Sequence, residues 1–244
     1  MLFPIGDTQV QGGYKPYFSY GFIALNIIIW IIQFTSTFEN PYPSYLIPEY
    51  GAVPSQIIQG KDYETLFTSM FMHGGWGHIL SNMLYMWIFA DNIEATIGHF
   101  RFVLFYLAGG IAAAYTHILL DTASNIPMVG ASGALSAVMG AYLVMFPKSQ
   151  IKILVIYLFR SFHVSAYIAL GIWIAFQLFN GIGGLDFLSG GEGKDSGGVA
   201  YWAHIGGFFF GVLMGFVFKS FVDKNDVYTP GSEGKLPKGN FFPT

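Results

Sequence analysis

The sequence predicts an all-α polytopic membrane protein, built as a bundle of six transmembrane helices. Two observations lead to this fold class. The 244 residues are 53% hydrophobic and 10% charged, with a mean hydropathy of +0.51, whereas soluble domains carry roughly 25% charged residues. The apolar residues also form continuous uncharged runs. A membrane β-barrel would instead show short segments of alternating polarity.

Six uncharged runs are candidate spans, because crossing roughly 30 Å of hydrocarbon takes about 20 apolar residues as a helix. In chain order they are 17–38, 78–90 with a further turn, 102–120, 132–146, 163–180 and 199–220. Turn and charge signals separate them at 40–43, 98–101, 125–127, 147–148 and in the glycine-rich stretch 181–198. We therefore expect a short N-terminal segment (1–16), a six-span domain (17–220) and a polar tail (221–244).

The basic residues predict the orientation of the bundle. With both termini in the cytoplasm, nine of them lie inside and two, Lys61 and Lys194, lie outside. The nine are Lys15, Arg101, Lys148, Lys152, Arg160, Lys219, Lys224, Lys235 and Lys238. This excess agrees with the positive-inside rule. It places Ser132 and His204 at the outer ends of their helices, although neither residue was used to choose the orientation.

Ser132 begins the fourth run, in the sequence Gly130-Ala131-Ser132-Gly133. A helix over 132–146 is only about 22 Å long at 1.5 Å per residue, which is short of the hydrocarbon thickness. The hydroxyl is therefore expected below the outer membrane surface. Taken alone, Ser132 is better explained as an ordinary helix N-cap, because serine is a common cap and a nucleophile is rare.

His204 lies near the start of the sixth run, one turn before a face of small residues formed by Gly207, Gly211 and Gly215. In the fourth run, Ser132, Ser136 and Gly140 have the same spacing. Such faces allow close helix packing in bilayers, so pairing them would bring a hydroxyl and an imidazole together. These two groups are the minimum for a serine nucleophile with its base. Helix packing alone would explain why the glycines recur on one face, but not why His204 lies next to them.

His78 and Asn82 share one face near the outer end of the second run, four residues apart. They could donate hydrogen bonds to a developing oxyanion. The alternative is that they bond neighbouring helices together.

Other classes of function lack support in the sequence. The chain has no Cys, a His-Glu-x-x-His zinc motif is missing, and a formal charge of −3 does not suggest a nucleic-acid partner. No metal or cofactor is expected. A transporter would also place polar groups inside the membrane, but at the midplane or on both sides rather than at one end.

These motifs resemble those of the rhomboid intramembrane serine proteases. His78-Ile79-Leu80-Ser81-Asn82, Gly130-Ala131-Ser132-Gly133 and Ala203-His204-Ile205-Gly206-Gly207 with Gly211 look like the family's three signature motifs, in order and in the expected spans. The resemblance covers all six spans and implies the rhomboid-like bundle in its simple bacterial form. It also implies a multi-pass protein of the bacterial inner membrane, with its active site open to the outer side.

The resemblance further implies a Ser–His dyad, with Ser132 as nucleophile and His204 as base and then acid. His78, Asn82 and the Ser132 backbone N–H would bind the oxyanion, and Gly130 would line the substrate strand. The substrates would be single-span membrane proteins, cut in or beside their helices. The resemblance also implies a first loop lying in the outer leaflet (39–77) and a mobile cap (181–198). A catalytically inactive rhomboid-like binding factor is the remaining alternative.

Two positions depart from the family pattern. Many members carry a Trp-Arg pair in the first loop, where this chain has Glu64-Thr65. Some members place a tyrosine under the histidine, one turn after the nucleophile, and here that position is Ser136. Another group must therefore orient His204.

Overall fold

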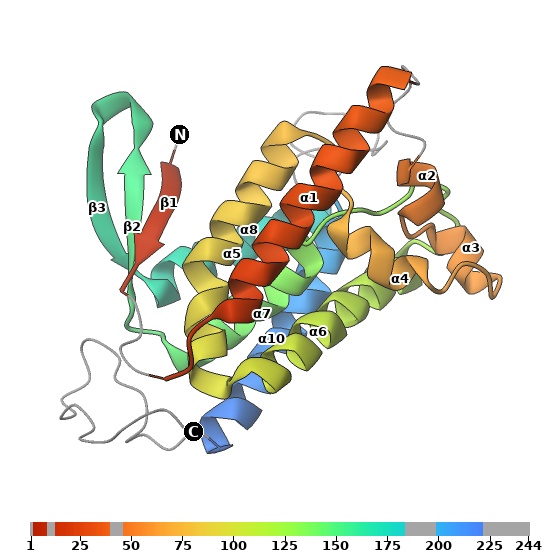
Figure 1. The fold of residues 1–244 in the computed structure, drawn as a ribbon. Helices are drawn as coiled ribbons and strands as arrows, with labels where there is room; N and C mark the ends of the chain where they lie inside the picture. Colours follow the sequence, from red (N-terminus) through yellow and green to blue (C-terminus); the bar gives the residue numbers. More distant parts are fainter. Residues whose placement is uncertain (1, 9–12, 40–45, 184–198, 222–244) are drawn as a thin grey trace, which may run out of the picture.

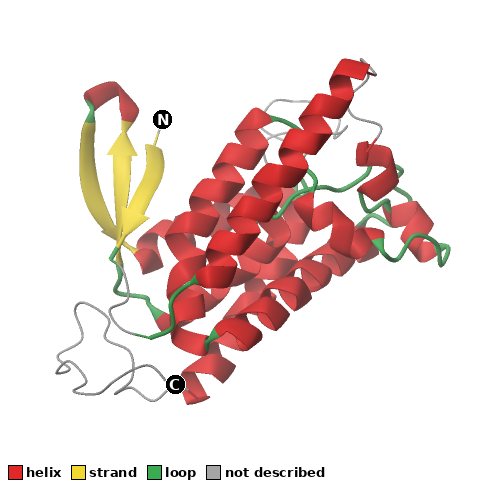
Figure 2. Cartoon of the chain, viewed as in Figure 1, coloured by secondary structure: helices red, strands yellow, loops and turns green. Residues whose placement is uncertain are grey.

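The computed structural model describes residues 2–8, 13–39, 46–183 and 199–221. A helical bundle makes up most of this part of the chain, and a small antiparallel sheet projects from one end (Figures 1 and 2). The protein is therefore mostly helical, and the strict all-α prediction is wrong. The predicted tail (221–244), apart from Phe221, and most of the predicted cap, at 184–198, lie outside the described residues.

The long helices are α1 (Tyr17–Glu39), α5 (Trp76–Ile97), α6 (His99–Leu120), α7 (Ser132–Met145), α8 (Ala166–Gly181) and α10 (Tyr201–Phe221). Three segments of the described helices are long and apolar enough to cross a membrane: Tyr17–Ser36, His99–Leu120 and Tyr201–Ser220. Helices α7 and α8 are shorter apolar helices. Helix α7 is 14 residues long, close to the predicted length.

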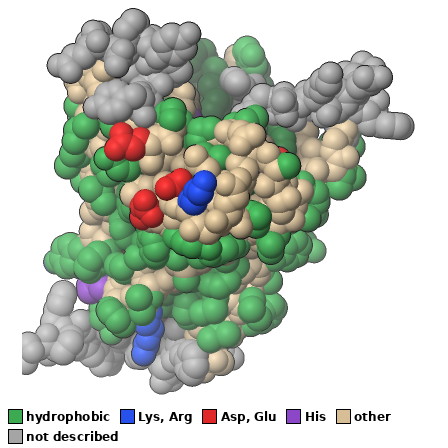
Figure 3. All heavy atoms as spheres, turned by 90° about the vertical axis from the view of Figure 1, so that its right-hand side faces the viewer, with side chains coloured by type: hydrophobic (Ala, Val, Ile, Leu, Met, Phe, Trp, Pro, Cys, Tyr) green, Lys and Arg blue, Asp and Glu red, His purple; other side chains and the backbone are tan. Residues whose placement is uncertain are grey.

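Helix α7 is central and packs against α10, α6 and α5. Its buried residues run without interruption from Ala134 to Tyr142, so this helix has little surface left for lipid. Figure 3 shows the face that carries the short helices α2 to α4. Charged side chains gather near the middle of that face, above a band in which hydrophobic side chains dominate.

Glycine has no side chain, and glycines on α7 and α10 allow the two helices to approach closely. A Cβ atom on Gly207 would lie 2.3 Å from the Gly133 carbonyl oxygen, and one on Gly211 would lie 1.9 Å from that of Ala137. The predicted glycine face of α10 is therefore the packing face. On α7 the contacts run through Gly133, Ala137 and Gly140. The predicted α7 face was therefore right at Gly140 and wrong at Ser132 and Ser136. The residues that contact Gly207 and Gly211 are Gly133 and Ala137.

The segment between α1 and α5 folds as short helices beside the bundle. These are α2 (Leu46–Tyr50), α3 (Pro54–Ile58), α4 (Thr65–Thr68) and the 3-10 turn η1 (Ser69–Phe71). An isolated bridge between Ala52 and Met128 ties this loop to the strand-like segment before Ser132. The Gly130 N–H also donates to the Ser69 carbonyl at 2.8 Å. The loop therefore holds the backbone next to Ser132 in place.

The sheet has the order β1-β2-β3, formed by β1 (Leu2–Asp7), β2 (Gln150–Val155) and β3 (Arg160–Ser165). β2 and β3 form a hairpin whose turn is the 3-10 segment η2 (Ile156–Leu158). The predicted fifth span begins too early, because His163 lies in β3 and the helix starts at Ala166. A period-two pattern rich in Ile and Val, as in β2, favours a strand.

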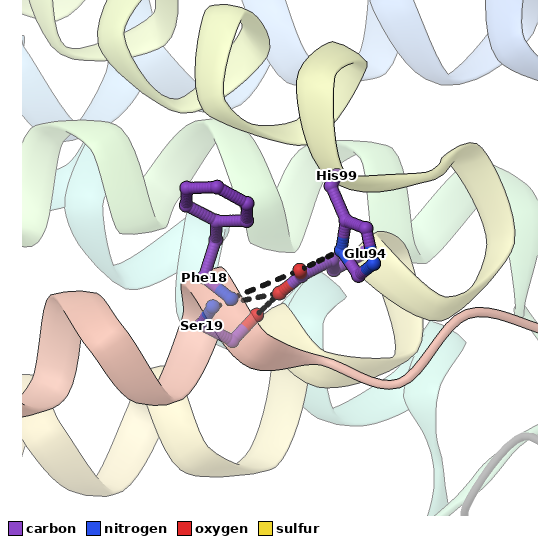
Figure 4. A network of polar contacts seen from close by, with 4 residues as sticks. All are labelled: Phe18, Ser19, Glu94 and His99. Carbon is purple, nitrogen blue, oxygen red and sulfur yellow. Dashed lines mark hydrogen bonds and ion pairs between the residues drawn. The ribbon is translucent and has the colours of Figure 1, made fainter.

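A buried carboxylate fixes the start of α1, and Figure 4 shows its contacts. Glu94 is fully buried, and its Oε2 accepts from the Ser19 N–H at 2.6 Å and from the Ser19 hydroxyl at 2.7 Å. Its Oε1 accepts from the Phe18 N–H at 3.0 Å and lies 2.6 Å from His99 Nδ1. The first-turn N–H groups of a helix lack partners within the helix. Here the Glu94 carboxylate accepts hydrogen bonds from two of them.

Candidate active site

The side chains of Ser132, His204 and Gln177 form a hydrogen-bonded chain. Ser132 Oγ lies 2.8 Å from His204 Nε2, and His204 Nδ1 lies 2.9 Å from Gln177 Oε1. Because an amide oxygen can only accept, Nδ1 carries the proton and Nε2 is free to accept the Ser132 hydroxyl proton. The structure thus brings together the two residues predicted from separate spans.

Three helices position this chain of residues. Ser132 is the first residue of α7, His204 lies in the first turn of α10, and Gln177 lies in the last turns of α8. The close α7–α10 contact at Gly207 lies one turn below His204, so the glycine packing sets the distance between the two reactive groups.

Two side chains of α8 orient the His204 ring. Trp173 lies one turn before Gln177 on the same helix, and its ring centroid is 5.9 Å from that of His204 at an interplanar angle of 37°. Gln177 is 6% exposed, so its bond to the imidazole is shielded from water. The Ser136 hydroxyl instead donates to the Ser132 carbonyl at 2.6 Å. The family's tyrosine position is therefore occupied by a backbone-bonded serine, and α8 supplies the contacts to the ring.

His78, Asn82 and Gly130 meet beside Ser132. Gly130 has a φ of +120°, and a Cβ atom there would lie 2.5 Å from His78 Nε2 and 3.5 Å from Asn82 Nδ2. Glycine is thus required both by the backbone conformation and by the space. Asn82 is 6% exposed, and its Nδ2 has no hydrogen-bond partner among the described residues. A buried donor left unpaired is unfavourable, so this amide is available to an incoming oxygen.

His73 packs against His78. Its ring stands edge-on to His78, with centroids 5.1 Å apart. Gln33 of α1 clamps its backbone, accepting from the His73 N–H at 3.1 Å and donating to its carbonyl. Burial lowers the pKa of His73 to about 4, and the neighbouring His78 adds to this effect. His73 is therefore neutral at physiological pH, and His78 has an uncharged neighbour.

Gln177 and Trp173 are the site residues that sequence reasoning missed. Both lie in the predicted fifth span, four residues apart and so on one helical face. An amide within an apolar run is itself a signal of function. That signal could have found Gln177, although not its partner 27 residues further along the chain.

The geometry resembles that of a hydrolase with a hydroxyl nucleophile. A serine is paired with a neutral imidazole, the imidazole is held by a third group, and an amide donor without a partner among the described residues, Asn82 Nδ2, lies close by. Comparison with known proteins agrees, since the Rhomboid domain family matches residues 60–221, more than half of the chain. The chain belongs to the rhomboid family. It is therefore an integral, multi-pass membrane protein.

Similar proteins include members from bacteria, yeast and plants. The chain is 32% identical to the Rhomboid protease GluP of Bacillus subtilis over 130 residues, covering 53% of this chain and 24% of the relative. It is 29% identical to the Rhomboid protein 1, mitochondrial, of Saccharomyces cerevisiae over 172 residues, covering 67% and 45%. It is 32% identical to RHOMBOID-like protein 4 of Arabidopsis thaliana over 189 residues, covering 76% and 42%. The chain thus spans less than half the length of each of these relatives.

Proposed function

We propose that this rhomboid protein is an intramembrane serine endopeptidase that hydrolyses peptide bonds in or beside the transmembrane helices of other membrane proteins. The observation that carries the proposal is the 2.8 Å contact between Ser132 Oγ and His204 Nε2. That distance is within the range needed for direct proton transfer from a nucleophile to its base.

In the first half of the reaction, Ser132 Oγ attacks the scissile carbonyl carbon and its proton passes to His204 Nε2. The C–O double bond opens to an oxyanion, and the imidazole becomes positively charged. The oxyanion then collapses, the C–N bond breaks, and the leaving amine takes the proton from Nε2. In the second half, water attacks the acyl carbon and its proton passes to His204 Nε2. The ester bond to Ser132 Oγ then breaks, and Oγ takes the proton from Nε2, which releases the acid product and restores Ser132.

Gln177 acts as a positioning residue in this scheme. Its Oε1 accepts from Nδ1–H, so it selects the tautomer in which Nε2 can take a proton. An amide adds no charge, so the imidazolium formed during the reaction is stabilised by a dipole rather than by a carboxylate.

The oxyanion would be bound by Asn82 Nδ2, by His78 and by the backbone N–H of Ser132. Donors that already point at the site need no rearrangement when charge develops, which is where such groups act most strongly. The support for Asn82 is its buried, unpaired Nδ2 beside Gly130.

Substrate class and topology follow from the same proposal. A transmembrane helix hides its carbonyls in internal hydrogen bonds, so the substrate must unwind near the site. Single-span proteins with helix-weakening residues near the outer membrane face are therefore the expected substrates. The excess of basic residues supports a bacterial inner-membrane protein with cytoplasmic termini and a site that opens outward. The division into a 17–220 protease domain and flanking segments belongs to this proposal.

The proposal is tested by mixing the purified protein with a generic single-span substrate in detergent. Wild type and Ser136→Ala should cleave it, and Ser132→Ala should not. Ser136 is the matched control because its hydroxyl lies one turn further along the same helix. A fluorophosphonate should label Ser132 in wild type and should fail to label His204→Ala. Cleavage by Ser132→Ala would overturn the proposal. A folded wild type that neither cleaves nor reacts would indicate a binding factor instead.

A further inference from the structure

The turn of the β2–β3 hairpin carries an unusual concentration of exposed apolar side chains. The hairpin tip is defined here as residues 156–159. Tyr157 is 79% exposed, Leu158 is 66% exposed and Phe159 is 88% exposed. These values match those of outward-facing residues on the membrane helices, such as Leu119 at 68% and Ile172 at 67%. In water, a contiguous apolar group of this kind marks an interaction site.

The hairpin has one mainly apolar face, on which Arg160 pairs with Val155 next to the turn, and one mainly polar face, which also carries Leu154. Its register pairs Ile153 with Phe162 and Ile151 with Val164, and paired residues lie on the same face. The opposite face carries the pairs Lys152 with His163 and Leu154 with Ser161. The hairpin is therefore amphipathic near the bundle and mixed in polarity next to its turn.

The apolar face is turned toward the bundle. At the base of the sheet, Ile151 is 1% exposed and belongs to the main hydrophobic core. Asp7, which pairs with Ile151, accepts a hydrogen bond from the Tyr142 hydroxyl of α7 and one of 2.7 Å from Asn92 of α5. Further from the base this face leaves the helices, and Phe162 is 43% exposed.

The sheet emerges at the end of the bundle opposite Ser132. β2 follows shortly after the end of α7 opposite Ser132, and β3 runs directly into α8. Figure 1 shows the sheet running beside the bundle from this end, with its turn well clear of the helices. The base of the sheet is therefore covered by the bundle, and the exposed turn is the part left for the surroundings of the protein.

The backbone at the tip supports a specific role for the aromatic side chains. Phe159 has a φ of 47°, in the left-handed region where bulky residues are rare and glycine or asparagine is common. Strained positions of this kind are kept where the surroundings or the function require them. Here the conformation presents a phenyl ring at the most exposed point of the hairpin.

We propose that the hairpin tip inserts into the bilayer in which the protein is embedded, at the interface of the leaflet nearer to the sheet. Tyrosine and other aromatic side chains favour the headgroup level, and arginine beside them binds lipid phosphate. The hairpin and its flanks, 146–165, carry Lys148, Lys152 and Arg160 and no acidic residue, which complements an anionic lipid surface. Lipid is the favoured occupant over a second protein because the surface continues that of the membrane-embedded bundle.

The absence of cysteine from the sequence allows a direct test. Leu158→Cys and Ser161→Cys each create a single thiol, one on the tip and one on the polar face, which can carry an environment-sensitive nitrobenzoxadiazole dye. Each labelled protein is placed at one copy per lipid nanodisc with a shallow doxyl-labelled phospholipid as quencher. We expect the dye at position 158 to be quenched at least about twofold more than the dye at position 161, with blue-shifted emission, because only the former reaches the interface.

Equal or no quenching at the two positions would overturn the proposal. Quenching at position 158 that vanishes at one copy per disc and returns at high protein-to-lipid ratio would indicate contact between copies, and would also overturn it. Tyr157→Cys provides a second tip position if Leu158→Cys does not fold, as judged by its thermal unfolding midpoint. The result is independent of catalysis, because none of these residues lies near Ser132.

Discussion

At one end of the bundle the buried carboxylate of Glu94 has a partner for each of its oxygens. At the other end the buried amide of Asn82 has none for its Nδ2 within the part of the chain that the structure describes. Both groups lie on α5, twelve residues apart along one helix. Both are shielded from solvent, with Glu94 at 0% and Asn82 at 6% exposure. The same helix therefore carries a completed polar network and an incomplete one.

The two groups have different proposed roles, Glu94 in stability and Asn82 in catalysis. A fully bonded network such as the one around Glu94 fixes the start of α1 and has no capacity left for a ligand. An unpaired donor beside a paired serine and histidine can gain a partner when substrate arrives. On this basis we expect damage at Glu94 to lower stability and damage near Asn82 to lower turnover.

The largest effect should come from the dyad. We expect Ser132→Ala and His204→Ala each to lower the cleavage rate by roughly 10⁴-fold or more, and the double variant to be no worse than either, because the two residues act as one unit. The thermal unfolding midpoint should change little. Cleavage rates and melting curves on the same preparations measure both effects. Additive losses, or unfolding in every variant, would return Ser132 and His204 to the class of packing residues.

This chemistry was partly predictable because its signals are local in the sequence. The spacing of Gly207 and Gly211 on one helical face predicted a close helix contact below His204, and the structure has it. A short run at 132–146 predicted a short helix, and α7 has 14 residues. The partner face on α7 was assigned one residue away from the contact, because sequence spacing alone does not fix the rotation of a helix about its axis.

The sheet and Gln177 could not be obtained in the same way. β1 pairs with a strand more than 140 residues away, and nothing near Leu2–Asp7 in the sequence indicates that partner. No element is predicted between the spans 132–146 and 163–180, although the alternation in β2 favours a strand. The role of Gln177 depends on its hydrogen bond to His204, which lies on another helix. Contacts between distant segments decide these features, and local patterns do not contain them.

Asn82 offers the next test of the contrast between the two ends. Losing one oxyanion donor typically lowers the rate by roughly 10²–10³-fold, so Asn82→Ala should slow cleavage by about this factor and remain more active than Ser132→Ala. Substrate affinity should change little, since the bond forms mainly in the transition state. Single-turnover rates at saturating substrate measure this loss. His78→Ala should behave similarly. A lower melting temperature with a normal rate would show that these residues bond helices together.

Glu94 should give the opposite pattern. We expect Glu94→Gln to lower the free energy of unfolding by about 2 kcal/mol, because the charge-assisted bonds to Ser19 and Phe18 are weakened. Turnover per fluorophosphonate-reactive site should stay within about twofold of wild type. Asp121→Asn is the matched control, since it removes an exposed carboxylate. A selective loss of turnover at unchanged stability would break the comparison between the two ends.

Gln177 should give the smallest effect and the sharpest distinction. Gln177→Met keeps nearly the same shape but removes the acceptor for His204 Nδ1–H. A neutral hydrogen bond contributes about 0.5–1.5 kcal/mol, so the turnover rate should fall roughly 3- to 10-fold. Gln177→Glu keeps an acceptor oxygen at the same reach and should recover most of the rate.

A positioning role also predicts how the loss divides between kinetic constants. Gln177 lies behind the imidazole, bonded to the nitrogen that faces away from Ser132. Its removal should therefore lower kcat and the rate of fluorophosphonate labelling together while KM stays constant. Trp173→Phe is the control, because it keeps an aromatic ring against His204 and leaves the hydrogen bond intact. Equal rates for Gln177→Met and wild type, or a Gln177→Glu variant as slow as Gln177→Met, would show that Gln177 only fills space and that the imidazole is held by packing alone.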